Sequence, residues 1–190
     1  MTLKDRLAQH EFLETNRLRL RPVGMADLED MYEYASDEET TRWTFPVNQT
    51  LEDTRQGIEK MYLADPVGKF ALELKGKQKM IGTLDTYGLS EQDKSLSIGF
   101  ILNKAYWGQG LASEALQAVL DLLLLDLDFE VVKAGHAQEN QASKRLLEKM
   151  GFQLVAQKKA DQVIAGQKVT SYYYELHRKE WQNYYGNRDC

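Results

Sequence analysis

The residues with the clearest chemical potential form a glycine loop, Tyr106-Trp107-Gly108-Gln109-Gly110-Leu111-Ala112-Ser113. Apolar patterning predicts a strand at 96–102 before this loop and a helix from about Gly110 to Leu125 after it. The first turn of a helix carries unpaired N–H groups and a partial positive charge. Glycine lets phosphate oxygens approach those N–H groups because no Cβ stands in the way. The loop therefore predicts a binding site for a phosphate-containing ligand.

The loop pattern alone leaves two other interpretations open. Glycines before a helix are common in loops that bind nothing. A dinucleotide-binding fingerprint is also similar, since Gly108-x-Gly110-x-x-Ser113 is followed by the acidic Glu130. However, serine replaces the third glycine, residues 104–107 separate the predicted strand from Gly108, and Glu130 begins a predicted strand instead of ending one. These departures disfavour an NAD(P)-dependent oxidoreductase.

A second informative segment runs from Asn140 to Phe152. Asn140 is suited to the N-cap of a predicted helix, and Ser143 lies on the first turn of that helix. Gly151 is typical of a residue that ends a helix. Capping alone explains Asn140, and an ordinary helix position explains Ser143, so this segment leaves a structural and a functional interpretation open.

The elements that must position these two segments predict an α/β (α+β) fold. Strict alternation over 17–21 indicates a half-buried strand. Further strands are expected at 70–74, 80–84, 96–102, 131–137, 153–158 and 169–175, and helices near 27–35, 51–64, 110–125 and 140–150. Antiparallel strands thus precede a strand-helix-strand-helix-strand stretch, which predicts a mixed sheet flanked by helices. Gly99, inside a strand, is expected to mark a bulge or a close approach by another backbone.

Length and composition limit the class of protein. A chain of 190 residues predicts one domain over 1–190, and its 43% hydrophobic and 28% charged residues are ordinary for a globular protein. The formal net charge of -5 argues against a general nucleic-acid-binding surface. Cys190 is the one cysteine, so we expect no disulfide framework, no CxxC site and no metal.

Targeting and membrane segments are not evident in the sequence. Charged and polar residues follow Met1, and the most apolar run, 122–125, is far below the roughly 20 apolar residues of a membrane span. The expected location is therefore cytoplasmic, and the expected assembly is a monomer or a homodimer.

With both segments in place, the chain resembles the GNAT superfamily of N-acetyltransferases. The family's cofactor signature, Arg/Gln-x-x-Gly-x-Gly/Ala, corresponds to Trp107-x-x-Gly110-x-Ala112, with Trp107 in place of the leading residue. Asn140 and Ser143, followed by Leu147-Glu148-Lys149-x-Gly151-Phe152, form the second signature. Within the superfamily the chain looks closest to the group of the ribosomal-protein N-terminal (Rim-type) acetyltransferases, and the resemblance extends from Glu14 to Glu175.

The resemblance implies a GNAT-like, mostly antiparallel sheet in which the central strands 96–102 and 131–137 splay apart. Acetyl-CoA would lie in the gap as cosubstrate, with its pyrophosphate on the glycine loop. Asn140 would position the cofactor or a water, and Ser143 would support the leaving thiolate. The resemblance assigns cofactor binding to Ile101, Leu102, Trp107, Gly108, Gln109, Gly110, Leu111, Ala112, Ser113 and Asn140.

The implied reaction is direct attack of a primary amine on the thioester in a ternary complex, the amine belonging to a protein N-terminus or to a small molecule. Many members of this group have a glutamate where this chain has Ser97, so the general base is open. Asp85, Glu139, His136 and Tyr174 are the candidates for it. A site without a strong base favours amines of low pKa, such as an α-amine near 7.7 to 8.0.

The acceptor pocket is expected to contain aromatic and acidic side chains. By analogy with the family, it is assigned to Trp43, Phe45, Asp85, Tyr87 and Ser97. A non-catalytic acyl-CoA-binding regulatory module is the alternative function, and Ser97 is the feature that favours it.

Overall fold

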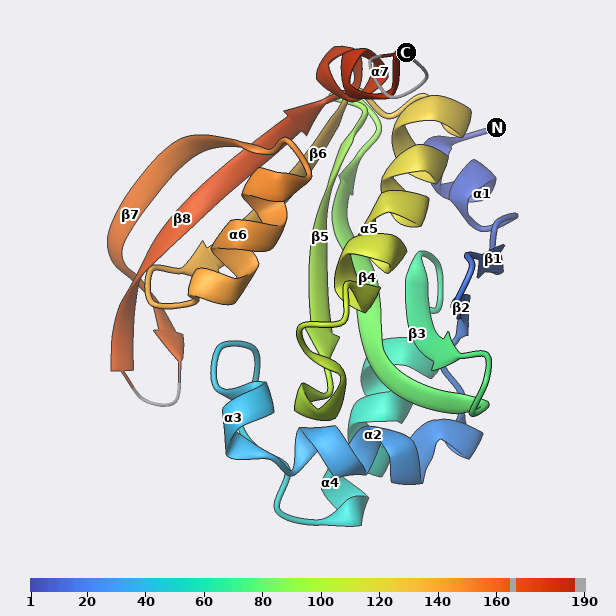
Figure 1. Ribbon diagram of the computed structural model, residues 1–190, viewed down its shortest axis with the longest axis vertical. Helices are drawn as coiled ribbons and strands as arrows, with labels where there is room; N and C mark the ends of the chain where they lie inside the picture. The colour runs from blue at the N-terminus through green and yellow to red at the C-terminus, as the bar shows by residue number, and fades with distance from the viewer. Residues whose placement is uncertain (165–166, 187–190) are drawn as a thin grey trace.

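The computed structural model describes residues 1–164 and 167–186, and in this part of the chain eight strands form one sheet (Figure 1). Their order in the sheet is β1-β2-β3-β4-β5-β6-β8-β7. Neighbouring strands run antiparallel except β5 and β6, which are parallel. The strand bounds are β1 Leu13–Glu14, β2 Leu18–Pro22, β3 Lys69–Leu74, β4 Lys79–Ser90, β5 Ser95–Leu102, β6 Val131–Ala137, β7 Gln153–Ile164 and β8 Gln167–His177.

Helices cover the sheet and close its ends. In Figure 1, α5 and α6 lie in front of the sheet, whereas α2, α3 and α4 gather at its lower end. The α-helices are α1 Leu3–Leu7, α2 Leu28–Ala35, α3 Glu38–Thr41, α4 Leu51–Gly57, α5 Leu111–Asp121, α6 Gln141–Lys149 and α7 Arg178–Gly186. Short 3-10 turns are η1 Met25–Asp27 and η3 Lys104–Tyr106, and π-helical segments are η2 Ile58–Leu63 and η4 Leu122–Asp126.

Two apolar cores lie on opposite faces of the sheet. Leu102 belongs to the larger core, which contains the buried residues of α5, whereas the adjacent Ile101 belongs to the smaller core with α2 and η2. Ala71 likewise belongs to the smaller core although it lies between Phe70 and Leu72, which belong to the larger one. Because successive strand residues point to opposite faces, this alternation assigns each core to one side.

The central strands separate as the resemblance implies. Pairing of β5 with β6 runs from Ser95↔Val131 to Ile98↔Ala134. Beyond that point β5 pairs with β4 alone, and β6 pairs with β8 alone. The mixed, mostly antiparallel sheet with a splayed central pair is therefore confirmed.

The bulge expected at Gly99 is wrong. The β4–β5 register continues without a shift through Asp85↔Gly99, and the irregularity of this ladder falls between Tyr87 and Ser90. The β5–β6 pairing stops after Ile98, while Gly99 stays in register with β4.

Several elements are longer than predicted or were not predicted. β4, β7 and β8 each extend beyond the expected strands. The helices expected at 51–64 and 110–125 change from α to π geometry near their ends, at η2 and η4. The terminal helices α1 and α7 had no sequence-based prediction. Within the described residues, no helix is long and apolar enough to cross a membrane, and Cys190 lies outside them.

Candidate active site

The glycine loop adopts the conformation that its glycines allow. Gly108 and Gly110 have φ of 72° and 76°, in the left-handed region that other residues avoid. Gly110 is also the N-cap of α5 and offers no side-chain acceptor to the N–H groups of the first turn. The amino end of α5 is therefore left for an external anion.

Contacts from two directions hold the loop in place. The indole N–H of Trp107 donates to the carbonyl oxygen of Leu102 at 2.6 Å, which ties the loop to the end of β5. The guanidinium of Arg17 donates to the carbonyl oxygen of Gln109 at 2.8 Å and pairs with Glu114 of α5 at 2.7 Å. Sequence reasoning missed Arg17 as a loop support, although the alternating arginines at 17–21 signalled a polar strand face.

A cleft of about 760 Å³ lies between the glycine loop, the end of β5, the segment after α3 and the first turns of α6. Its volume falls in the range of small-molecule sites, roughly 300 to 1,000 Å³. Of the residues expected to bind cofactor, Gln109 does not line the cleft. Those that do are Ile101, Leu102, Trp107, Gly108, Gly110, Leu111, Ala112, Ser113 and Asn140.

Asn140 and Ser143 also lie on this cleft. The Asn140 side chain accepts a hydrogen bond from the Ser143 amide at 3.1 Å and so caps α6. The Ser143 hydroxyl forms no hydrogen bond to any group in the described part of the chain. The serine is half-buried, so its hydroxyl is available to a bound ligand.

The residues expected in the acceptor pocket do not form one pocket. Trp43 lines the cleft, with the Arg42 guanidinium 4.9 Å from its ring centroid. Phe45 does not line it, and neither do Asp85, Tyr87 and Ser97. The last three lie together on the face of the smaller core, where Tyr87 pairs with Ser97 and Asp85 with Gly99.

Asp85 stands out among the four base candidates. Its Oδ2 accepts a hydrogen bond from the Tyr62 hydroxyl at 3.2 Å, and its Oδ1 is buried without a partner in the described chain. Burial raises the pKa of Asp85 to about 6, against the lowering effects of the Tyr62 hydrogen bond and the Lys69 charge. Buried acids whose pKa lies near neutrality are typical of general bases.

Tyr62 was also missed from the sequence. It lies on the π-helical η2, and Ile58 of η2 and Thr54 of α4, four and eight residues earlier, are buried as well. Its hydroxyl lies 3.3 Å from Thr83 Oγ1. The spacing of four could have signalled a buried tyrosine in need of a polar partner.

The other base candidates are less suitable in geometry. Both ring nitrogens of His136 are engaged, with the Ala137 carbonyl oxygen at 2.7 Å and the Tyr174 hydroxyl at 3.3 Å. The rings of His136 and Tyr174 are stacked, and Tyr174 is part of the larger core. Glu139 lines the cleft but is exposed.

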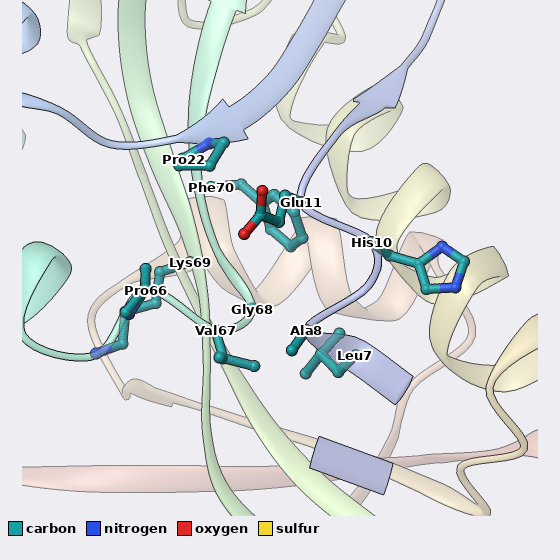
Figure 2. Close-up of a pocket in the computed structure, with 10 residues that line it drawn as sticks. All are labelled: Leu7, Ala8, His10, Glu11, Pro22, Pro66, Val67, Gly68, Lys69 and Phe70. Carbon is teal, nitrogen blue, oxygen red and sulfur yellow. The ribbon is translucent and has the colours of Figure 1, made fainter. Parts of the chain in front are cut away.

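A smaller depression lies beside the end of α1. Figure 2 shows it, with Leu7 and Ala8 near Val67 and with Glu11 in front of Phe70. Its volume is about 20 Å³, room for about one water and too little for a cosubstrate. No group of three metal-binding side chains occurs among residues 1–164 and 167–186.

Comparison with known proteins agrees with this geometry. Residues 17–153 match the family model of the acetyltransferase (GNAT) domain. Over 175 residues the chain is 27% identical to p20, an uncharacterized N-acetyltransferase of Bacillus licheniformis, covering 90% of this chain and 98% of that protein. A GNAT-family acetyltransferase from Bacillus anthracis superposes with a TM-score of 0.80 at 27% identity, covering 89% and 99% of the two chains.

Two more distant structures share the fold and contain CoA. One is RimL, the ribosomal L7/L12 α-N-protein acetyltransferase, with a TM-score of 0.77 at 20% identity over 88% of this chain and 98% of that one. The other is spermidine N-acetyltransferase from Vibrio cholerae with CoA and spermine, with a TM-score of 0.75 at 17% identity over 89% and 100%. The Rim-type group is thus one of several structural neighbours.

Proposed function

This chain belongs to the GNAT family of acetyltransferases, and on that premise we propose that it transfers the acetyl group of acetyl-CoA to a primary amine. Family membership gives acetyl transfer from acetyl-CoA; the nature of the acceptor and the roles of individual residues are the proposal. The observation that supports it best is the cleft between the glycine loop and α6. It joins an uncapped helix end to the free hydroxyl of Ser143.

The residues that line the cleft fit CoA chemically. Main-chain N–H groups of the loop, from Gly108 to Ser113, would hold the diphosphate at the amino end of α5. Beyond Ile98, β5 has no β6 neighbour, so main-chain N–H groups near Ile101 and Leu102 that face the gap have no strand beside them. The Leu102 carbonyl oxygen is already occupied by the Trp107 indole. These N–H groups would hold the pantetheine amides and polarise the thioester carbonyl.

Asp85 is the proposed general base. Acetyl-CoA supplies the acetyl group as an activated thioester, and the amine must lose a proton to remain acylated. Asp85 does not line the cleft, so it accepts that proton through a bridging water. Its Oδ1 forms no hydrogen bond within the described residues, and its pKa is about 6. It shares a sheet face with Ile101, which lines the cleft. A base at this position compensates for Ser97 in place of glutamate.

Ser143 and Asn140 serve the leaving group. A thiol has a pKa of about 8.5, far below that of a serine hydroxyl, so Ser143 donates a hydrogen bond to the departing thiolate and keeps its own proton. Asn140 fixes the first turn of α6 and thereby the position of Ser143.

The acceptor is proposed to be cationic before it reacts. RimL acts on a ribosomal-protein N-terminus and the Vibrio cholerae enzyme on spermidine, and both acceptors are primary amines. Glu39 and Glu139 line the cleft, and the chain has a net charge of -5, which suits a positively charged partner. A Rim-type protein N-terminus is the finer form of the proposal.

Acceptor-dependent release of CoA thiol tests the proposed function. Purified protein with acetyl-CoA should release thiol with at least one member of a panel of N-terminal peptides, polyamines and small amines. Comparing peptides with a free and a blocked α-amine separates α-amines from lysine side chains. CoA binding without release over the whole panel would contradict the proposal and favour the non-catalytic module.

A further inference from the structure

Cations without carboxylate partners gather at the cleft. Arg42, Arg145 and Lys149 line it, and none of them forms an ion pair with a carboxylate in the described part of the chain. Elsewhere lysines and arginines are commonly paired, as Arg17 is with Glu114 and Lys104 with Asp37. In an acidic protein, unpaired cations at a cleft indicate an anionic ligand.

Arg145 and Lys149 are one helical turn apart and so share a face of α6. This face borders the cleft, because Ala142 and Leu146 line it as well. The Lys149 ammonium lies 3.3 Å from Ser113 Oγ, in the first turn of α5. Lys149 is six residues beyond Ser143, about 9 Å along the helix axis. The pair therefore lies beside the phosphate end of the cleft and away from the acyl-transfer end.

We propose that Arg145 and Lys149 form the subsite for the 3′-phosphate of the cosubstrate and make the enzyme selective for CoA over 3′-dephospho-CoA. The inference rests on the proposed mode of cofactor binding. The end of a helix supplies only about half a positive charge, which suits a diphosphate held by several N–H groups. A phosphate monoester carries about -1.5 to -2 at pH 7 and requires side-chain cations. Arg145 and Lys149 line the cleft, and Lys149 lies beside the first turn of α5. Arg17 also lies near this helix end, but its guanidinium is engaged by Glu114 and by the Gln109 carbonyl oxygen.

Calorimetric titration with CoA and with 3′-dephospho-CoA tests this subsite. The wild-type protein should bind CoA at least about tenfold more tightly, equivalent to about 1.4 kcal/mol. The double variant Arg145→Gln/Lys149→Gln should lose most of this preference while its affinity for 3′-dephospho-CoA stays within about twofold. Both side chains are exposed, so a thermal melt should show an unchanged fold.

Lys144→Gln is the matched control. Lys144 is on the same helix, but it pairs with Glu148 at 3.8 Å and does not line the cleft. This variant should bind both ligands as the wild type does. If Lys144→Gln lost as much of the preference for CoA as the double variant does, the preference would be an effect of overall charge. That result would contradict the proposed subsite.

Two further results would overturn the inference. Equal wild-type affinity for CoA and 3′-dephospho-CoA would remove the selectivity, and an equal loss for both ligands in the double variant would assign the cations to the diphosphate. Either result leaves the proposed acetyl transfer intact. Failure of the wild type to bind either ligand would instead contradict the proposed cofactor site itself.

Discussion

The cofactor end and the acceptor end of the proposed site are built from different kinds of contact. The cofactor end uses two short segments, the glycine loop and the start of α6, and its main donors are main-chain N–H groups at a helix end. The acceptor end brings together Tyr62, Thr83 and Asp85 from η2 and β4, and its polar contacts are between side chains. A site built from main-chain groups tolerates many different side chains at its positions, whereas a cluster of side chains depends on the identity of each residue in it.

The two ends also differ in their electrostatics. The cofactor end is open and has positive potential from a helix terminus and unpaired cations. The acceptor end contains a buried carboxylate whose pKa is raised by burial. Substitutions at the cofactor end should therefore affect cofactor binding, and substitutions at the acceptor end should affect turnover and its pH dependence.

Asp85→Asn should have the largest effect on turnover, a loss of about 100-fold or more, because it removes the proposed base. Affinity for CoA should remain within about twofold. In the wild type the base form exists above the pKa of Asp85, about 6, so kcat/KM should fall as pH drops through 6. A pH–rate profile measures this limb, and the variant should lack it.

Ser97→Ala, on the same face, is the control and should change turnover little. If Asp85→Asn kept a rate close to that of the wild type, Asp85 would be excluded as the base.

Ser143→Ala should lower kcat by about tenfold at saturating acetyl-CoA, because the leaving thiolate loses a hydrogen-bond donor. CoA affinity and the stability of α6 should be retained, since Asn140 still caps the helix through the main chain of residue 143. Asn140→Ala provides the contrast, with a stability loss of about 1 kcal/mol from the missing cap. Turnover of Ser143→Ala within about twofold of the wild type would refute the assignment.

Gly110→Ala should weaken CoA binding by roughly tenfold while the pH limb of the wild type is kept. Its φ of 76° costs a residue with a Cβ about 1 to 2 kcal/mol, so the loop would relax away from the conformation that exposes the amide groups. Gly24→Ala is the control, because Gly24 has a φ of -133° and no described atom lies within 4 Å of the position that an added Cβ would occupy. If the Gly110→Ala variant bound CoA with the affinity of the wild type, the conformation of this loop and its amide donors would not be essential for binding.

The local geometry around the glycine loop and the start of α6 could be predicted from the sequence better than the side-chain contacts of Asp85, for a physical reason. A helix cap and a glycine turn are local, so the Asn140 cap and the turn at Gly110 could be predicted from neighbouring residues alone. The contacts of Arg17 with Gln109 and of Tyr62 with Asp85 join segments distant in sequence, and periodicity identifies a buried face without naming its partner. The expected pocket of Trp43, Phe45 and Tyr87 did not assemble for the same reason.

For the fold as well, the sequence predicted the elements that local patterns determine and missed those that depend on tertiary contacts. Alternation at 17–21 indicated a strand close to β2, and the order of strands and helices indicated the mixed sheet. β7 exceeded its predicted end at 158 because hydrogen bonds to β8 sustain a polar strand through Ile164. α7 has little apolar periodicity, yet Trp181 is fully buried and donates to Asp121 at 2.8 Å. Such elements depend on tertiary contacts that local patterns do not contain.

Tyr62→Phe should give the smallest change in turnover. It also distinguishes most clearly between tuning of the Asp85 pKa and a structural role for Tyr62. The tyrosine hydroxyl donates to Asp85 and thereby lowers the pKa of that carboxyl against the larger raising effect of burial. Removing the hydroxyl should raise the Asp85 pKa further, so the acidic limb of kcat/KM should move to higher pH while the plateau falls only a few-fold. A structural role alone would lower the rate equally at every pH. An unmoved limb with a lower plateau would therefore show that Tyr62 supports the fold without tuning the base.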